Sequence, residues 1–275
     1  MAEETFSQGS LKTLIQLNYK EKKTVYPLKK GDCIRSSGFA SLCPREEVLA
    51  ALYNIIRSEE FDANSLLTFS LGTDFHSRLQ DEILPRIGVM FGAWKCNNCS
   101  KVFGGMGKKK GFDFDAMITK PVKCTKCHSS DFRYQEHSFK DTEHGISGHP
   151  DGFIVIPGRD GPGVIEAKSI GAKGAAEIRK CPKFEHVIQA QLYLMFTGFK
   201  WSVLLYWDKS SYGLNALTEH FIDRDEDTIS LINETLQSVW SGLDGGPLPE
   251  RICGTIEAPR AKTCACASKC FMKEG

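Results

Sequence analysis

Cysteine placement is the feature that most constrains how this chain can fold. Eleven cysteines are spread over 275 residues, too long a chain for a small disulfide-stapled domain. The first residues, MAEETFSQGSLKTL, have neither the basic segment nor the apolar segment of a secretory signal. We therefore expect a cytoplasmic protein without membrane contact, whose cysteines bind metal rather than form disulfides. The cysteines fall into groups: Cys33 and Cys43; Cys96, Cys99, Cys124 and Cys127; Cys181 alone; and Cys253, Cys264, Cys266 and Cys270.

The middle group consists of two C-x-x-C pairs separated by twenty-four residues. Four thiolates arranged in this way predict a tetrahedral Zn²⁺ site, with Cys96, Cys99, Cys124 and Cys127 as ligands. The segment between the pairs is basic and aromatic, which suits contact with phosphates and stacking on bases, or else a solvated loop. Its residues in question are Lys108, Lys109, Lys110, Phe103, Phe112 and Phe114.

Composition changes around this group divide the chain into three parts. Residues 94–134 are rich in Lys, Gly and paired cysteines and read as an inserted zinc-binding module, which we call the four-cysteine module. Residues 1–42 form an N-terminal segment with little periodic signal, and residues 43–93 and 135–275 form the core. Within that core, apolar periodicity predicts helices over 44–58, 70–90, 183–197 and 226–240, and strands over 145–158, 161–171, 201–207 and 214–222. Pro85 is expected to kink the second helix, and the C-terminal tail is expected to be loop-like.

Two carboxylates on the first pair of these strands form the strongest chemical signal. Asp151 lies on one strand, and Glu166 and Lys168 lie on the next, in a predicted hairpin. Glu166 and Lys168 share a face because strand side chains alternate. With the carbonyl of Ala167, the two carboxylates suit Mg²⁺ or Mn²⁺, and Lys168 can orient or deprotonate a water or neutralise a phosphate. The alternative is a surface salt bridge on a β-strand.

Four short motifs in this order resemble the PD-(D/E)xK nuclease superfamily, and more closely its RecB-like exonuclease branch. The motifs are GTDFH from Gly72 to His76, HPDG with Asp151, EAK with Glu166 and Lys168, and QAQLY from Gln189 to Tyr193. The resemblance implies an α/β fold of restriction-endonuclease type, with a mixed sheet flanked by helices. It also implies that His76 joins Asp151 and Glu166 at the metal, and that Gln189 and Tyr193 belong to the catalytic site and position DNA.

The remaining cysteines resemble those of RecB-like exonucleases that carry a [4Fe–4S] cluster, including the CRISPR-associated ones. Cys43 precedes a predicted helix, and Cys264 and Cys270 keep the C-x5-C spacing of that group. The resemblance implies a cluster held by Cys43, Cys253, Cys264 and Cys270, with Cys266 as an alternative ligand, stapling the C-terminus to the fold. A second Zn²⁺ is the alternative, and Cys33 and Cys181 read as ordinary thiols.

The overall charge limits how the chain can meet nucleic acid. Its formal net charge is only +1, so any contact with a polyanion must be local. The leading hypothesis is a metal-dependent DNA exonuclease acting on single strands or free ends, in recombination, repair or replication and possibly of phage or mobile-element origin. The alternative is a nucleic-acid-binding or assembly subunit whose nuclease fold acts only with a partner, such as a helicase or recombination protein.

Overall fold

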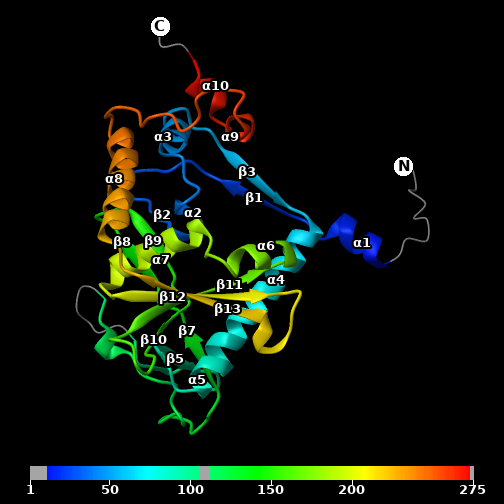
Figure 1. Cartoon of the computed structure of the whole chain (residues 1–275), viewed down its shortest axis with the longest axis vertical. Coiled ribbons are helices and arrows are strands. Elements are labelled where there is room, and N and C mark those ends of the chain that lie inside the picture. Colours follow the sequence, from blue (N-terminus) through cyan, green and yellow to red (C-terminus); the bar gives the residue numbers. More distant parts are fainter. Residues whose placement is uncertain (1–10, 106–111, 273–275) are drawn as a thin grey trace.

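A five-stranded mixed sheet forms the centre of the molecule (Figure 1). The computed structural model describes residues 11–105 and 112–272. The strand order is β13-β12-β11-β10-β4, in which only β11 and β12 run parallel. The strands are β4 (Met90–Phe91), β10 (Gly152–Ile154), β11 (Gly163–Ile170), β12 (Trp201–Asp208) and β13 (Leu217–Asp223). The expected mixed sheet is confirmed.

Helices cover both faces of this sheet, as expected. On one face, α7 packs against β11, β12 and β13, and α6 packs against β12. On the other face, α4 crosses β11 and runs diagonally past the sheet (Figure 1). The helices are α3 (Pro44–Leu52), α4 (Ala63–Arg78), α6 (Ala172–Ile178), α7 (Phe184–Thr197) and α8 (Glu226–Leu243). Because both faces are covered, β11 and β12 are buried along most of their length.

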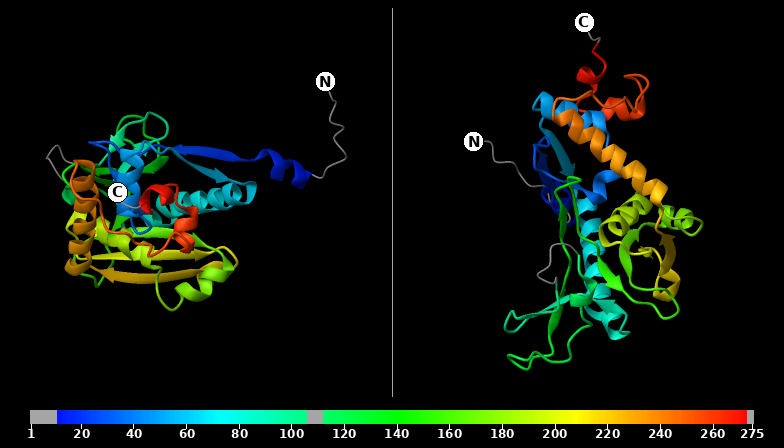
Figure 2. Two further views of the ribbon diagram at one scale, coloured as in Figure 1. Left: turned by 90° about the horizontal axis from the view of Figure 1, so that it is seen from above. Right: turned by 90° about the vertical axis from the view of Figure 1, so that its left-hand side faces the viewer.

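The helix expected over 44–58 is shorter in the structure. It ends at Leu52, where Asn54 takes a left-handed conformation (φ 50°), and the chain then forms β3 (Arg57–Phe61). Strand β3 pairs with β1 (Glu21–Val25), in the segment where we expected little regular structure. Opposite charges face each other across this pair, because Lys22 contacts Glu60 at 3.1 Å. With α1 (Leu11–Asn18), the pair forms an arm that projects from the body (Figure 2).

The helix expected over 70–90 begins earlier and is interrupted. Asp62 caps α4 by accepting the backbone N–H of Ser65, so the helix starts at Ala63. A π-helical turn (Leu79–Ile83) follows, and α5 (Leu84–Arg86) ends the segment. Pro85 lies in the first turn of α5, where its missing N–H is tolerated, so the helix is interrupted at the π turn rather than kinked by proline.

The strand expected over 145–158 is split between two sheets. Its first part is β9 (Ile146–Gly148), which pairs with β2 (Ile34–Arg35) and β8 (Phe139–Asp141). Its second part is β10 in the main sheet, and Asp151 lies in the turn between them. The strand expected over 214–222 begins only at Leu217, after a 3-10 turn (Gly213–Ala216).

Two regions lie at opposite ends of the long axis (Figure 1). At one end, β5 (Ala93–Cys96), β6 (Val102–Phe103) and β7 (Phe132–Gln135) form the sheet of the four-cysteine module, with a 3-10 turn at Phe114–Ala116. At the other end, α9 (Pro259–Thr263) and α10 (Ala267–Cys270) lie beside α3, so the tail is partly helical rather than loop-like. A short α2 (Ser36–Phe39) packs on α7. Across the described ranges, no helix combines the length and apolar character required to cross a membrane.

Candidate active site

The hairpin of β10 and β11 brings the two expected carboxylates together. Gly152 pairs with Ile165, so Asp151 and Glu166 each stand one residue beyond that pair at the same end of the hairpin. Both side chains are buried, with 6% and 3% of their surface exposed. Asp151 Oδ2 accepts the backbone N–H of Ala167 at 2.6 Å, which fixes its carboxylate against β11.

His76 reaches this pair from α4. Its Nδ1 lies 3.2 Å from Asp151 Oδ1. A Cβ on Gly72, one helical turn earlier, would lie 3.0 Å from Ser169 Oγ of β11, so glycine lets α4 approach the sheet closely there. Burial opposes charge on the imidazole, but the hydrogen bond to Asp151 and its negative charge outweigh this and raise the pKa of His76.

Lys168 lies at the centre of a hydrogen-bonded chain. Its Nζ donates to Glu166 Oε1 at 2.5 Å and to Gln189 Oε1 at 3.0 Å. The amide of Gln189 donates in turn to the hydroxyl of Tyr193 at 2.8 Å, and that hydroxyl donates to the carbonyl of His149. Gln189 and Tyr193 are one turn apart on α7 and are 4% and 1% exposed. These hydrogen bonds fix the ammonium of Lys168 through Gln189. Gln189 and Tyr193 are thus buried beside Lys168 and do not lie free on the surface.

The carboxyl group of Glu166 has a perturbed pKa. Burial and the negative charge of Asp151 raise the pKa of Glu166 to about 7, against the opposing effects of Lys168 and His76. Its second oxygen, Oε2, is buried without a hydrogen-bond partner among the described residues. A buried unpaired carboxylate oxygen is costly unless a cation or donor reaches it. The donor set of Asp151, Glu166 and His76 therefore fits a divalent cation, although these three side chains do not crowd as closely as the four cysteines described below.

A cavity of ≈ 490 Å³ opens beside these groups. Glu166, Lys168, Gln189 and Tyr193 line one side of it. The opposite side comes from the small β2-β9-β8 sheet and from α2, and it is rich in hydroxyls and cations. The cavity therefore connects solvent with Glu166 and Lys168, whereas Asp151 and His76 do not line it.

Sequence reasoning missed one residue that touches the site. Gln80 lies in the π-helical turn after α4 and is 8% exposed. Its amide donates to the backbone carbonyl of Asp151 at 2.8 Å and to Glu136 Oε1 at 2.8 Å. No motif marks this glutamine, because the π turn that aims it is a consequence of tertiary packing.

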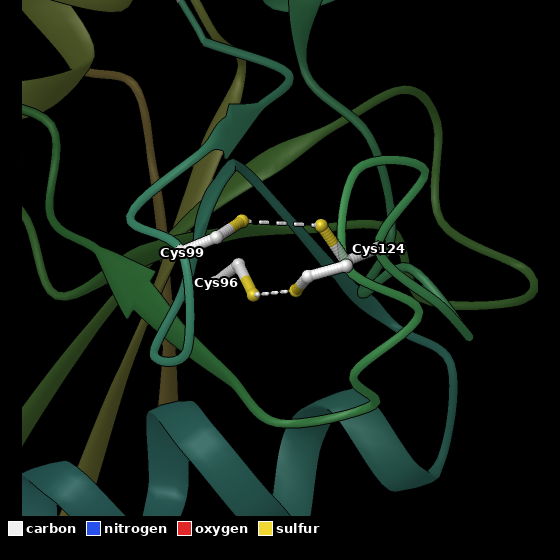
Figure 3. A group of neighbouring side chains, drawn as sticks. Cys96, Cys99 and Cys124 are labelled. Atoms are coloured by element: carbon white, nitrogen blue, oxygen red, sulfur yellow. Dashed lines mark hydrogen bonds between the residues drawn. The ribbon is translucent and has the colours of Figure 1, made fainter.

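The four expected zinc ligands come together at the end of the molecule (Figure 3). Within the described residues, Cys96, Cys99, Cys124 and Cys127 form the one group of possible metal ligands whose ligand atoms all lie within 4.8 Å of one another. The sulfur atoms of Cys96 and Cys127, and those of Cys99 and Cys124, are 3.5 Å apart. Thiolates around a tetrahedral Zn²⁺ stand about 3.8 Å apart, as follows from Zn–S bonds of about 2.3 Å. The geometry fits a bound metal of this kind.

The two C-x-x-C turns have the same backbone structure. In each turn the first cysteine donates its N–H to the carbonyl five residues on, Lys101 in one turn and Ser129 in the other. The residue after the second cysteine, Ser100 or His128, has a left-handed φ of 59°. Hydrogen bonds from the backbone of Ser129 and from Asn98 lower the pKa of Cys127 to about 6. Such donors favour the thiolate form that binds metal.

The aromatic residues of the module pack against neighbouring rings. Phe112 packs against Phe153 with ring centres 4.9 Å apart, and Phe114 packs against Phe91 at 5.6 Å. Phe103 packs against Phe132 at 5.6 Å. These half-buried rings therefore pack against the core, and base stacking by them stays a prediction. Lys108, Lys109 and Lys110 lie outside the described residues.

The four C-terminal cysteines and Cys43 line one cavity at the opposite end of the molecule. They are Cys43, Cys253, Cys264, Cys266 and Cys270. Cys266 is fully buried and its thiol donates to the carbonyl of Glu46 at 3.5 Å, whereas the other four are half-buried. The cavity is narrow, ≈ 20 Å³, so a bound metal group requires the lining side chains to turn. Of the two thiols read as ordinary, Cys181 is exposed and Cys33 is half-buried.

Comparisons with known proteins give distant structural likenesses. No protein-family model matches the sequence, and no curated protein matches it. An alkaline exonuclease from Laribacter hongkongensis is similar in structure, with a TM-score of 0.45 and 16% identity over 78% of this chain and 90% of that chain. Its complex with dAMP gives a TM-score of 0.45 and 17% identity over 78% and 89%. A phage-related exonuclease from Haemophilus somnus gives a TM-score of 0.30 and 16% identity over 40% and 58%. Because these likenesses are distant, we argue function from the side chains of this chain alone.

Proposed function

We propose that the chain is a Mg²⁺- or Mn²⁺-dependent DNA exonuclease. The buried and unpaired Oε2 of Glu166 carries the proposal, because it stands beside Asp151 and the fixed ammonium of Lys168. Asp151, Glu166, His76 and the carbonyl of Ala167 would hold the cation. A divalent cation bound there would polarise the scissile phosphate and lower the pKa of the attacking water.

The residues around the cation each have a separate part in the proposed reaction. Although burial disfavours its charge, the carboxylates of Glu166 and Asp151 raise the pKa of Lys168, so its ammonium keeps its protons. Lys168 can then donate to the attacking water or to the phosphate and offset negative charge as the bond breaks. Gln189 and Tyr193 hold Lys168 in place, which makes them positioning residues.

A second metal centre is proposed at the cavity lined by the five cysteines. Cys43, Cys253, Cys264 and Cys270 are the proposed ligands, since Cys266 is turned towards Glu46. Ligation of a single ion requires sulfur atoms that lie as close together as those of the four-cysteine group. The sulfur atoms of this second set lie less close together. The proposed group is a [4Fe–4S] cluster with a second Zn²⁺ as the alternative, and either one requires the lining side chains to turn.

The nuclease proposal is tested on linear DNA labelled separately at its 5′ and 3′ ends. Protein purified without oxygen, with or without added Mn²⁺, is compared with Lys168→Ala and with the control Lys173→Ala, an exposed lysine on α6. We expect Mn²⁺-dependent loss of one label before the other. Only Lys168→Ala should lower the rate, by about 10²-fold or more.

Two results would contradict the proposal. One is the absence of cleavage by protein with its metal sites filled, which would favour a binding or assembly subunit that acts only with a partner. The other is a rate for Lys168→Ala equal to that of Lys173→Ala.

A further inference from the structure

The positive charge of the chain is concentrated in the four-cysteine module. Residues 94–134 contain nine Lys and Arg and three Asp, a formal charge of +6 within a chain of net +1. The rest of the chain therefore sums to −5, although it contains the proposed site for a polyanionic substrate. A near-neutral chain can attract a polyanion only through a local patch of this kind.

Two cations of this patch, Lys95 and Arg133, lie on the outer face of the module's sheet, and Lys101, Lys123 and Lys126 are exposed around its two cysteine turns. In β5 and β7 the side chains of Trp94, Cys96, Phe132 and Tyr134 are buried, so Lys95 and Arg133 point away from the core. Lys95 and Arg133 are cross-strand partners in the register of these strands. Like charges placed directly opposite each other destabilise a sheet. The pair of Lys95 and Arg133 therefore lowers the stability of the free protein, and a bound anion would restore that stability.

The cations of the module lack carboxylate partners among the described residues. The cations concerned are Lys95, Lys101, Lys123, Lys126 and Arg133, and none of them forms an ion pair among the described residues. Elsewhere, exposed lysines such as Lys22, Lys30 and Lys200 are paired with carboxylates at 2.5–3.1 Å. The nearest acidic residue in the module, Asp131, accepts a hydrogen bond from Asn97 instead.

The patch is connected rigidly to the proposed active site. Asp81, in the π turn after α4, accepts the backbone N–H of Tyr134 at 2.6 Å. Gln80, its neighbour, links Glu136 to the carbonyl of Asp151. A strand of nucleic acid bound along β5 and β7 is thus held at a fixed position relative to Asp151.

We propose that five cations of the four-cysteine module, Lys95, Lys101, Lys123, Lys126 and Arg133, bind the DNA backbone outside the cleaved segment. The inference takes DNA as the polyanion from the proposed function, but it does not depend on catalysis. Contact is with phosphates, so it holds the substrate without reading its sequence.

The test is the salt dependence of DNA binding. The module variant carries Lys95→Ala, Lys101→Ala, Lys123→Ala, Lys126→Ala and Arg133→Ala. The control variant removes five exposed lysines elsewhere: Lys12→Ala, Lys20→Ala, Lys29→Ala, Lys173→Ala and Lys180→Ala. Both are made in a Lys168→Ala background, so that hydrolysis does not interfere, and zinc content and circular dichroism confirm that each variant is folded.

Binding of labelled duplex DNA is followed by anisotropy between about 50 and 200 mM salt. Each lost phosphate contact lowers the slope of log K against log salt by about 0.9, so we expect a decrease of about 4 in the module variant. The control variant should keep the wild-type slope. An unchanged slope in the module variant, or an equal decrease in both variants, overturns the inference.

Cleavage is measured separately, with Lys168 intact, to keep the two proposals distinguishable. If the wild type binds through the module but never cleaves, the nuclease proposal fails and the inference stands. If the wild type cleaves while the binding slope is independent of the module, the inference alone fails. A further expected result is that the module variant loses activity on long DNA through a higher KM and keeps it on oligonucleotides too short to reach the module.

Discussion

Contacts made by single residues outside the motifs help to hold the proposed site in place. The Q-x-x-x-Y pattern predicted that Gln189 and Tyr193 share a helical face, and the structure places them on one face of α7. Gln189 contacts Lys168 and Tyr193 contacts Gln189, and another element, β9, lies close against Tyr193. At Gly148 of that strand, an added Cβ would lie 2.4 Å from Ser36 Oγ and 2.9 Å from Tyr193 Cε1. Glycine is therefore required here for close approach, not for an unusual backbone angle.

This closeness gives a prediction for Gly148→Ala. The methyl group would displace the ring of Tyr193, and with it the hydrogen bond that holds Gln189. We expect a loss of about 1–3 kcal/mol in the free energy of unfolding, as for other overpacked cores, measured by urea denaturation. Gly171→Ala is the matched control, because nothing lies within 4 Å of its Cβ position. Equal stability of the two variants would show that Tyr193 is not held by this contact.

At the scale of elements, the sequence predicted what local periodicity determines. The β10–β11 hairpin, α7 and α8 are strongly patterned, and the structure contains all three. The expected helix extended to Ser58, into the start of β3, because Ile55 and Ile56 continue the apolar spacing of α3. The strand structure of β3 depends instead on pairing with β1, in which Glu21 faces Phe61, forty residues later, and no local window contains both partners. Gln80 was missed for the same reason, since only the π turn directs its amide to Asp151.

The π turn itself can be tested through Gln80→Leu. The substitution leaves the carbonyl of Asp151 and the carboxylate of Glu136 without their buried donor, which costs about 1–3 kcal/mol of stability. Because Asp151 is a proposed metal ligand, we also expect a higher Mn²⁺ concentration for half-maximal cleavage. Gln135→Leu is the control, since the amide of Gln135 donates only to the neighbouring carbonyl of Tyr134. A loss of stability without a change in Mn²⁺ dependence would assign Gln80 a structural role only.

For the whole molecule, the two cysteine groups have different relations to the core. The four-cysteine module packs on the core, because Cys96 and Cys124 share a buried cluster with Ile154 and Ile165 of the main sheet. At the other end, Cys266 packs with Leu49 and Ala50 of α3 in a cluster of its own. Other contacts between the tail and this part of the chain include hydrogen bonds from Arg45 to the carbonyl of Pro249 and from Arg260 to that of Ser41.

This difference predicts the result of Cys264→Ser combined with Cys270→Ser. If these thiolates hold a metal group with Cys43, the group closes a loop of over two hundred residues, and its loss should cost about 2–5 kcal/mol, as removal of a native cross-link does. Metal analysis of anaerobically purified protein should then show that iron and sulfide are lost while one zinc per chain remains with Cys96, Cys99, Cys124 and Cys127. Cys181→Ser, at an exposed thiol, should change neither stability nor metal content. If the double variant instead loses zinc and contains no iron before or after mutation, the second centre is a zinc site. Should its metal content and stability match those of Cys181→Ser, the tail is held by packing alone, because no metal would then connect it to α3.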